Sequence, residues 1–88
     1  MAISVVRMKI KILFFASCRD IVGTKELDLE VQEGFRVRDL KRNLLEEYPR
    51  LAALNDVLSV AINAEYVDES VLLNPGDEVA FIPPVSGG

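Results

Sequence analysis

The chain has 88 residues, of which 50% are apolar and 27% are charged. This length supports one domain with a hydrophobic core and is too short for two, and the composition is that of a globular protein. Fourteen acidic and ten basic residues leave a net charge of −4, which disfavours nucleic-acid binding and favours a basic protein partner. Because no histidine is present, the commonest general base and metal ligand are missing. We therefore expect a domain that holds no metal and is not an enzyme on its own.

Two segments in the first part of the chain alternate as β-strands do. Residues 8–15 place Ile10, Ile12 and Phe14 on one face, and residues 25–31 alternate apolar and acidic side chains. Gly23 marks a turn between the segments, which predicts a hairpin-like pair. Residues 1–7 are interpreted as a leader. Basic residues interrupt its apolar stretch before a signal peptide or membrane span develops, which favours a cytoplasmic protein without a membrane partner.

The apolar residues change to a helical period in residues 37–48. The buried face is expected to carry Val37, Leu40, Leu44, Leu45 and Tyr48, and the opposite face Arg38, Lys41, Arg42 and Glu46. The helix is expected to end before Pro49. Arg36 occupies the N-cap position, where a guanidinium cannot accept hydrogen bonds from the first-turn amides. A Ser or Thr at this position is therefore predicted to stabilise the domain.

The second half of the chain predicts a short helical or irregular segment and three more strands. The helical or irregular segment is residues 51–54, and the strands are residues 58–63, 66–67 and 78–82. Asn74-Pro75-Gly76-Asp77 predicts a type II turn before the last strand. The order of elements predicts an α+β fold, a ubiquitin-like β-grasp with a mixed sheet and one main helix on one face. We expect this domain to span residues 1–82, followed by an extended C-terminal tail at residues 83–88.

The tail is the least ordinary feature of the sequence. Pro83 and Pro84 cannot continue a strand, and six extended residues at roughly 3.3 Å each reach about 20 Å from the domain. Since glycine has no Cβ, Gly87 and Gly88 fit a passage too narrow for other residues and would carry the terminal carboxylate to a partner's catalytic groups. A frayed C-terminus is the other interpretation of the Gly-Gly pair alone.

Two longer motifs give the tail a context. The segments KILFFASCRDIVG (residues 11–23) and NPGDEVAFIPPVSGG (residues 74–88) strongly resemble the opening and closing motifs of the MoaD family, the small subunits of molybdopterin synthases. That family shares LFFA-x-x-R-[ED]-x-x-G and GDEVAF-x-PP-V-[ST]-GG, and the resemblance spans nearly the whole chain. The closing motif is the specific one, because a general ubiquitin-like carrier is expected to have the glycines without the rest of it.

The resemblance implies a sulfur carrier for molybdenum cofactor biosynthesis. An ATP-dependent, E1-like enzyme would adenylate Gly88, and sulfur would then replace AMP to give a thiocarboxylate. AMP and sulfur would thus be carried covalently, with no permanently bound cofactor. The thiocarboxylate would donate sulfur to cyclic pyranopterin monophosphate in a MoaE-type large subunit, within a heterotetramer of two small and two large subunits. Val85, Ser86 and Gly87 would lie in the large subunit's active site.

Strand parity predicts a second contact with the partner. On the sheet face away from the helix, the first and last strands turn from charged to apolar toward the tail, at Leu13, Phe15, Ala80 and Ile82. If these strands are parallel and adjacent, the four side chains form an exposed apolar patch beside the tail, which is typical of a protein interface. The alternative is that Leu13 and Phe15 are buried under a loop.

Two residues of the opening motif receive separate predictions. Arg19 matches the family motif and is expected to contact a partner, or else to pair with Asp20 or Asp77 at the surface. Cys18 falls at a position that the motif leaves variable, and we expect a small, half-buried residue rather than a catalytic thiol.

Three other functions are compatible with the same tail. A sulfur carrier of another pathway, such as thiazole formation or tRNA thiolation, would differ only in its acceptor. A ubiquitin-like modifier would pass its activated carboxylate to lysines of target proteins. A binding module with an inert tail would do neither. The closing motif argues against the carrier of another pathway, whereas the tail chemistry permits a modifier as well, and intact mass spectrometry would separate these functions.

Overall fold

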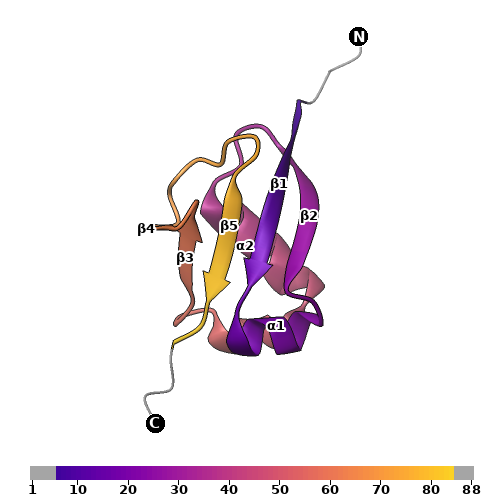
Figure 1. Cartoon of the computed structure of the whole chain (residues 1–88), viewed down its shortest axis with the longest axis vertical. Helices are drawn as coiled ribbons and strands as arrows, with labels where there is room; N and C mark the ends of the chain where they lie inside the picture. Colours follow the sequence, from indigo (N-terminus) through magenta and orange to yellow (C-terminus); the bar gives the residue numbers. More distant parts are fainter. Residues whose placement is uncertain (1–5, 85–88) are drawn as a thin grey trace.

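The computed structural model describes residues 6–84, so the expected leader is described only from Val6 onward and the tail only as far as Pro84. Five strands form one mixed sheet in the order β2-β1-β5-β3-β4, with α2 behind it and α1 at one end (Figure 1). The elements are β1 (Arg7–Phe14), α1 (Ala16–Val22), β2 (Glu26–Gln32), α2 (Val37–Glu47), the 3₁₀ helix η1 (Pro49–Leu54), β3 (Ser59–Ile62), β4 (Glu65–Val67) and β5 (Glu78–Ile82). This architecture confirms the predicted fold class.

β1 lies between β2 and β5 and connects the two halves of the sheet. It pairs antiparallel with β2 and parallel with β5, with Phe14 opposite Phe81 in the β5 register. Ile10, Ile12 and Phe14 are buried on the helix side, as predicted, and the Phe14 and Phe81 rings stack with centroids 6.3 Å apart. The core contains Met8, Ile10, Ile12, Phe14, Cys18, Val31, Val37, Leu40, Leu44, Leu51, Val60, Leu73, Val79 and Phe81.

α1 was not predicted from the sequence, and it corrects two expectations. The connection from β1 to β2 is this seven-residue helix, not a hairpin-like turn, and Phe15 is its N-cap residue, not the last residue of β1. The helix ends at Gly23, whose φ of +90° is readily accessible only without a side chain and whose N–H donates to the Arg19 carbonyl. Cys18, which lies on this helix and was expected to be half-buried, is fully buried.

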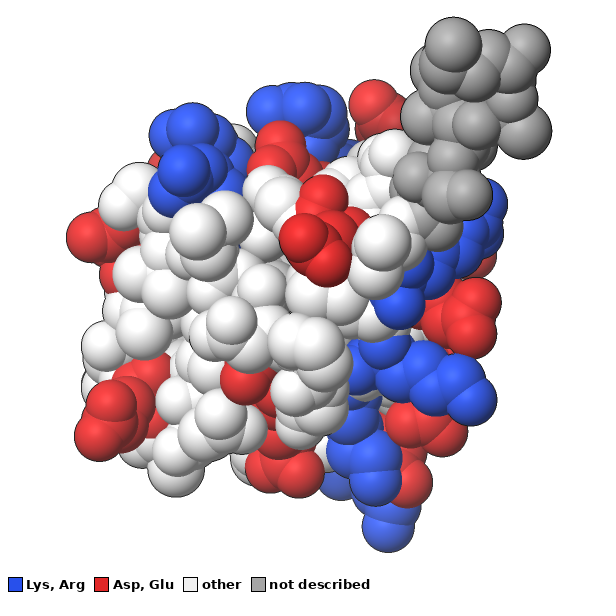
Figure 2. Space-filling view, turned by 90° about the horizontal axis from the view of Figure 1, so that it is seen from above, with Lys and Arg blue, Asp and Glu red and all other residues white. Residues whose placement is uncertain are grey.

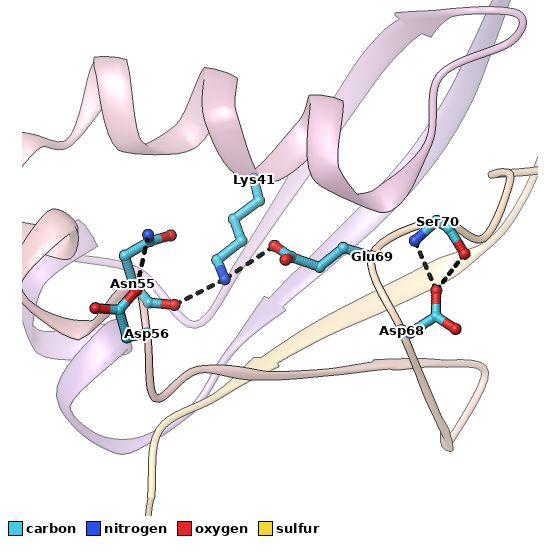
Figure 3. A network of polar contacts seen from close by, with 6 residues as sticks. All are labelled: Lys41, Asn55, Asp56, Asp68, Glu69 and Ser70. Carbon is cyan, nitrogen blue, oxygen red and sulfur yellow. Dashed lines mark hydrogen bonds and ion pairs between the residues drawn. The ribbon is translucent and has the colours of Figure 1, made fainter.

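α2 covers the helix-side face of the sheet along the predicted apolar stripe. Lys41 is an exception, since it was expected to face solvent and is only 7% exposed. Its ammonium group donates to the Asn55 carbonyl at 2.8 Å and forms an ion pair with Glu69 at 3.0 Å (Figure 3). A buried Lys needs such partners because desolvation penalises the charge. Lys41 therefore connects the helix to the loops after η1 and β4.

The start of α2 contradicts the prediction of an uncapped helix at Arg36. The amides of Val37 and Arg38 donate to the carbonyls of Val71 and Glu69, both at 3.0 Å. The Asp39 carboxylate accepts from the Arg36 N–H at 2.9 Å, and the guanidinium donates to the Ser70 carbonyl at 2.6 Å. The loop after β4 thus supplies the acceptors that the N-cap side chain lacks. These acceptors lie more than 30 positions further along the sequence than the residues they bond.

The loop that supplies these acceptors has its own local order. Asp68 accepts hydrogen bonds from the backbone N–H and the hydroxyl of Ser70 (Figure 3). These bonds, the hydroxyl bond first, lower the pKa of the Asp68 carboxyl. A depressed carboxyl pKa in the folded state stabilises the loop above the ordinary pKa of Asp, and this stabilisation is lost as the pH falls through the folded-state value.

Two tight turns set the register of the last strands. β3 and β4 are joined by Asn63 and Ala64, whose φ values of 49° and 72° are those of a type I′ hairpin turn. Before β5, Gly76 has a φ of +82° and the Asp77 N–H donates to the Asn74 carbonyl, which confirms the predicted type II turn. The Asp77 carboxylate is buried and accepts from the Asn74 N–H and the Asn63 side chain.

Candidate functional site

The chain leaves the domain at the end of β5, beside the end of β1. Parallel pairing brings Leu13 next to Ala80, as the predicted parallel and adjacent arrangement requires. Beyond Ile82, Pro83 is buried and Pro84 is exposed. Neither can donate to a neighbouring strand, so the ladder ends here. The predicted tail residues Val85, Ser86, Gly87 and Gly88 lie outside the described residues.

The face of the sheet away from α2 is apolar near this exit. Strand pairing places five apolar side chains and Ser59 on it, because directly opposite residues point to the same face. The apolar five define a surface. We call them the outer apolar patch: Leu13, Ala61, Tyr66, Ala80 and Ile82. Leu13 and Ile82 are half-buried, and Tyr66 is 72% exposed.

Ala80 differs from its predicted exposed state. It is only 9% exposed, although it points away from the helices. It lies between Leu13 of β1 and Ala61 of β3, and these neighbouring strands shield its single methyl group. Ala80 and Ala61 have the smallest side chains and therefore form the lowest part of the patch, at its centre. The larger side chains form its borders.

Tyr66 and Ala61 were not among the residues predicted for this surface. Their face follows only from the pairing of β3 with β4 and β5, which sequence alternation over three or four residues does not determine. The available signal was an aromatic residue at an edge strand directly after a two-residue turn.

Phe15 and Arg19 lie on α1 or at its start, at the end of the sheet where the chain exits (Figure 1). Phe15 is 46% exposed, so it is not buried under a loop, and its N–H donates to the Phe81 carbonyl at 3.3 Å. Arg19 is exposed and forms no ion pair within residues 6–84. The predicted pairing with Asp77 is excluded because that carboxylate is buried near the start of β5 and occupied by asparagine donors.

The other half of the outer face is charged. Lys9 and Lys11 of β1 lie opposite Glu30 and Asp28 of β2, and Lys11 also lies opposite Glu78 of β5. Lys11 approaches Glu26 to 4.0 Å, with both side chains nearly half exposed. Such exposed pairs contribute about 0–1 kcal/mol each. Viewed from the end where β1 begins, basic and acidic residues lie side by side along the upper and right-hand margins of the molecule (Figure 2).

The described residues were also compared with what metal binding, thiol chemistry and membrane insertion require. No group of three or more His, Cys, Asp and Glu side chains is arranged to hold a metal between residues 6 and 84. Burial raises the pKa of the Cys18 thiol, which disfavours the reactive thiolate. None of the helices in this part of the chain has the length and apolar character needed to cross a membrane.

Comparison with known proteins places this geometry in context. The ThiS family model matches residues 12–88. A protein of Chlamydomonas reinhardtii described as a molybdopterin synthase sulfur carrier subunit is 39% identical, and the match covers 92% of this chain and 100% of the relative. A human protein with the same description is 32% identical, with 91% and 94% covered.

Solved structures share the fold. A molybdopterin converting factor subunit 1 of Pyrococcus furiosus, described as putative, superimposes with a TM-score of 0.81 at 31% identity, covering 89% of this chain and 99% of the other. The small archaeal modifier protein 1 of Methanosarcina acetivorans gives 0.79 at 28% identity, covering 94% and 99%. A subunit in the complex of subunits 1 and 2 of the Helicobacter pylori molybdopterin-converting factor gives 0.66 at 24% identity, with 92% and 100% covered.

Proposed function

The chain belongs to the ThiS family, and from this premise we propose that it is the sulfur carrier subunit of a molybdopterin synthase. The observation that carries the proposal is that the family match extends to Gly88, together with curated relatives that carry this description over nearly their whole length. The domain supplies a reagent on its C-terminus, and the catalytic groups come from its partners. The absence of histidine from the sequence agrees with this division of labour.

The chemistry requires activation of the Gly88 carboxylate. In the proposed sequence, a carboxylate oxygen attacks the α-phosphate of ATP, pyrophosphate leaves, and an acyl adenylate forms on an E1-like enzyme. A sulfide-level sulfur donor then attacks the carbonyl carbon, the bond from that carbon to the AMP oxygen breaks, and a thiocarboxylate remains. In the large subunit its sulfur forms a bond to a side-chain carbon of cyclic pyranopterin monophosphate as an oxygen leaving group departs from that carbon. Water then cleaves the bond between that sulfur and the Gly88 carbonyl carbon, so the sulfur stays on the pterin and the carboxylate is restored. AMP and sulfur are therefore transient covalent cargo, and no resident cofactor is involved.

The outer apolar patch and Phe15 are proposed to contact the large subunit while the tail enters its active site. The patch lies on β5, which leads into the tail, and on its neighbours β1, β3 and β4, so one docking event would fix both the domain and the direction of the tail. Ala61 and Ala80 leave room for a partner's side chain between Leu13 and Tyr66. Arg19 is proposed to contact the large subunit or the activating enzyme. The assembly is proposed to be a cytoplasmic heterotetramer of two small and two large subunits.

Intact mass spectrometry tests the proposal directly. After co-expression with the activating enzyme, we expect a mass change equal to the replacement of one oxygen by sulfur. A chain that ends at Gly87 should keep the same thermal melting curve and lose all dithiolene synthesis with the purified large subunit. Retained synthesis by the shortened chain would contradict the carrier function. A chain extended by one residue beyond Gly88 is the matched control for tail length, and it should be inactive as well.

A modifier function is the second candidate, and the structural similarity to small archaeal modifier protein 1 favours it. In that case the acyl adenylate would pass to a lysine amine of another protein and form an isopeptide bond. The same mass measurement separates the functions, because a modifier would appear in high-mass adducts and a binding module would show no change. A carrier for thiazole formation or tRNA thiolation would acquire sulfur but fail to convert cyclic pyranopterin monophosphate.

A further inference from the structure

β2 is the outermost strand on one side of the sheet, opposite the border formed by β4 (Figure 1). An edge strand presents backbone N–H and C=O groups that another extended chain can pair with. The hydrogen bonds between β1 and β2 determine which groups these are. The Phe14 N–H donates to the Lys25 carbonyl, and the Glu33 N–H donates to the Val6 carbonyl.

Antiparallel strands alternate between pairs that exchange hydrogen bonds and pairs that do not. Because Phe14–Lys25 and Val6–Glu33 are bonded pairs, the odd-numbered residues of β2 bond to β1, and the even-numbered ones turn their backbone groups outward. The hydrogen bonds on the other side of β1 agree with this assignment of odd and even residues. There Lys9 and Lys11 bond to the chain segment that leads into β5, through Gly76 and Asp77.

The outward groups of β2 are not equally available. The hydroxyl of Thr24 donates to the Glu26 carbonyl at 3.1 Å and accepts from the Glu26 N–H at 3.5 Å, so this end of the edge is covered. At the other end, the Gln32 carbonyl accepts from the Phe35 N–H at 3.1 Å. Between them, the outward N–H and C=O groups of Asp28 and Glu30 have no backbone or side-chain partner among residues 6–84.

The side chains of this edge indicate what kind of strand fits it. Asp28 and Glu30 are exposed on the outer face, and neither carboxylate has an ion pair within 4.0 Å among the described residues. On the helix side, Leu27 and Leu29 are half-buried and leave apolar surface at the border. A matching strand therefore needs basic residues on one face and aliphatic residues on the other, which is the pattern that β1 presents to β2 from the inside.

We propose that the β2 edge at Asp28–Glu30 accepts an extended segment of a partner protein as a sixth strand, with Lys or Arg alternating with aliphatic residues. A second copy of this chain does not fit, because two β2 edges in antiparallel contact would place acidic side chains opposite acidic side chains. β1 separates this edge from β5, so a partner bound here leaves the end of β5 and the outer apolar patch uncovered. The edge is thus a separate docking site from the one in the proposed function.

The test uses the whole chain and the synthetic peptide acetyl-RVKIKV-amide, followed by amide NMR. We expect shifts and increased protection from solvent exchange at the amides of Asp28, Glu30 and Gln32, and binding that weakens as NaCl is raised. The peptide acetyl-EVEIEV-amide should not bind. Absent binding of the basic peptide, or shifts centred on Leu13 and Ile82, would overturn the proposal. Self-association of the protein that moves the same β2 amides would also overturn it.

Variants of Glu30 separate the backbone contribution from the charge. Glu30→Pro removes an outward N–H without removing a bond to β1, and we expect about tenfold weaker peptide binding. Glu30→Gln keeps the N–H and should weaken binding roughly twofold to fivefold. Glu47→Gln, an exposed acid on α2, is the matched control and should bind like the parent. If Glu30→Pro fails to fold, Asp28→Lys with Glu30→Lys must abolish binding, and retained binding would refute the proposal.

Discussion

The two faces of β1 and β5 differ far more than their shared backbone suggests. On the helix-covered face, Ile10, Ile12, Phe14, Val79 and Phe81 are each at most 3% exposed. On the outer face, the same strands carry exposed Lys9 and Glu78 at one end and half-buried Leu13 and Ile82 at the other. The covered face is apolar along its whole length because it holds α2. The outer face is apolar only beside the tail exit, which is the asymmetry that the proposed docking surface requires.

A charge on the covered face should have the largest effect. Phe14→Asp would bury a carboxylate with no cationic partner, and it would remove the ring that stacks on Phe81. Large core truncations alone cost about 3–5 kcal/mol, which is comparable to the whole stability of a small domain. We therefore expect an unfolded chain, measured by circular dichroism and thermal melting. A cooperative melt near that of the parent would show that this face is not the core.

The same substitution one residue later should have the opposite outcome for folding. Phe15 is 46% exposed at the N-cap of α1, where its side chain makes no capping bond. Phe15→Asp places a good N-cap residue there, so the domain should remain folded. Binding to the large subunit should weaken by about 2 kcal/mol or more, as at interface hot spots.

Calorimetric titration of the large subunit measures this second effect. Val6→Asp is the matched control, because Val6 is a similarly exposed apolar residue just before β1, at the other end of the strand from Phe15. It should bind like the parent chain. Equal losses for both variants would mean that the binding energy is not concentrated at the tail end of the outer face.

The core, the order of the main elements and the type II turn could be predicted because they depend on local patterns. Strand alternation assigned Phe14 and Phe81 to the covered face, and the Pro-Gly pair at residues 75–76 defined its turn. α1 was missed because its seven residues give too short an apolar period to separate from a turn. The burial of Ala80 and Lys41 depends on neighbours from distant segments, which a single sequence does not bring together.

The start of α2 shows the same limit and yields the smallest expected effect. The covered face persists only while α2 stays on it, and the loop after β4 holds the first turn of the helix through the carbonyls of Glu69, Ser70 and Val71. The sequence predicted that a hydroxyl in place of Arg36 would stabilise the helix. The structure reverses that expectation, since the amides that a hydroxyl would accept from already have backbone partners.

Arg36→Ser should therefore lower stability by about 0.5–1 kcal/mol, because it removes the guanidinium bond to the Ser70 carbonyl and satisfies no new donor. Asp39→Ala, which deprives the Arg36 N–H of its acceptor at 2.9 Å, should cost at least as much, within the ~0.5–2 kcal/mol of cap substitutions. Urea denaturation at neutral pH measures both. A higher midpoint for Arg36→Ser would mean that the loop carbonyls bind the first turn weakly in solution. In that case the buried side chains of α2 and the contacts of Lys41 would hold the helix on the covered face.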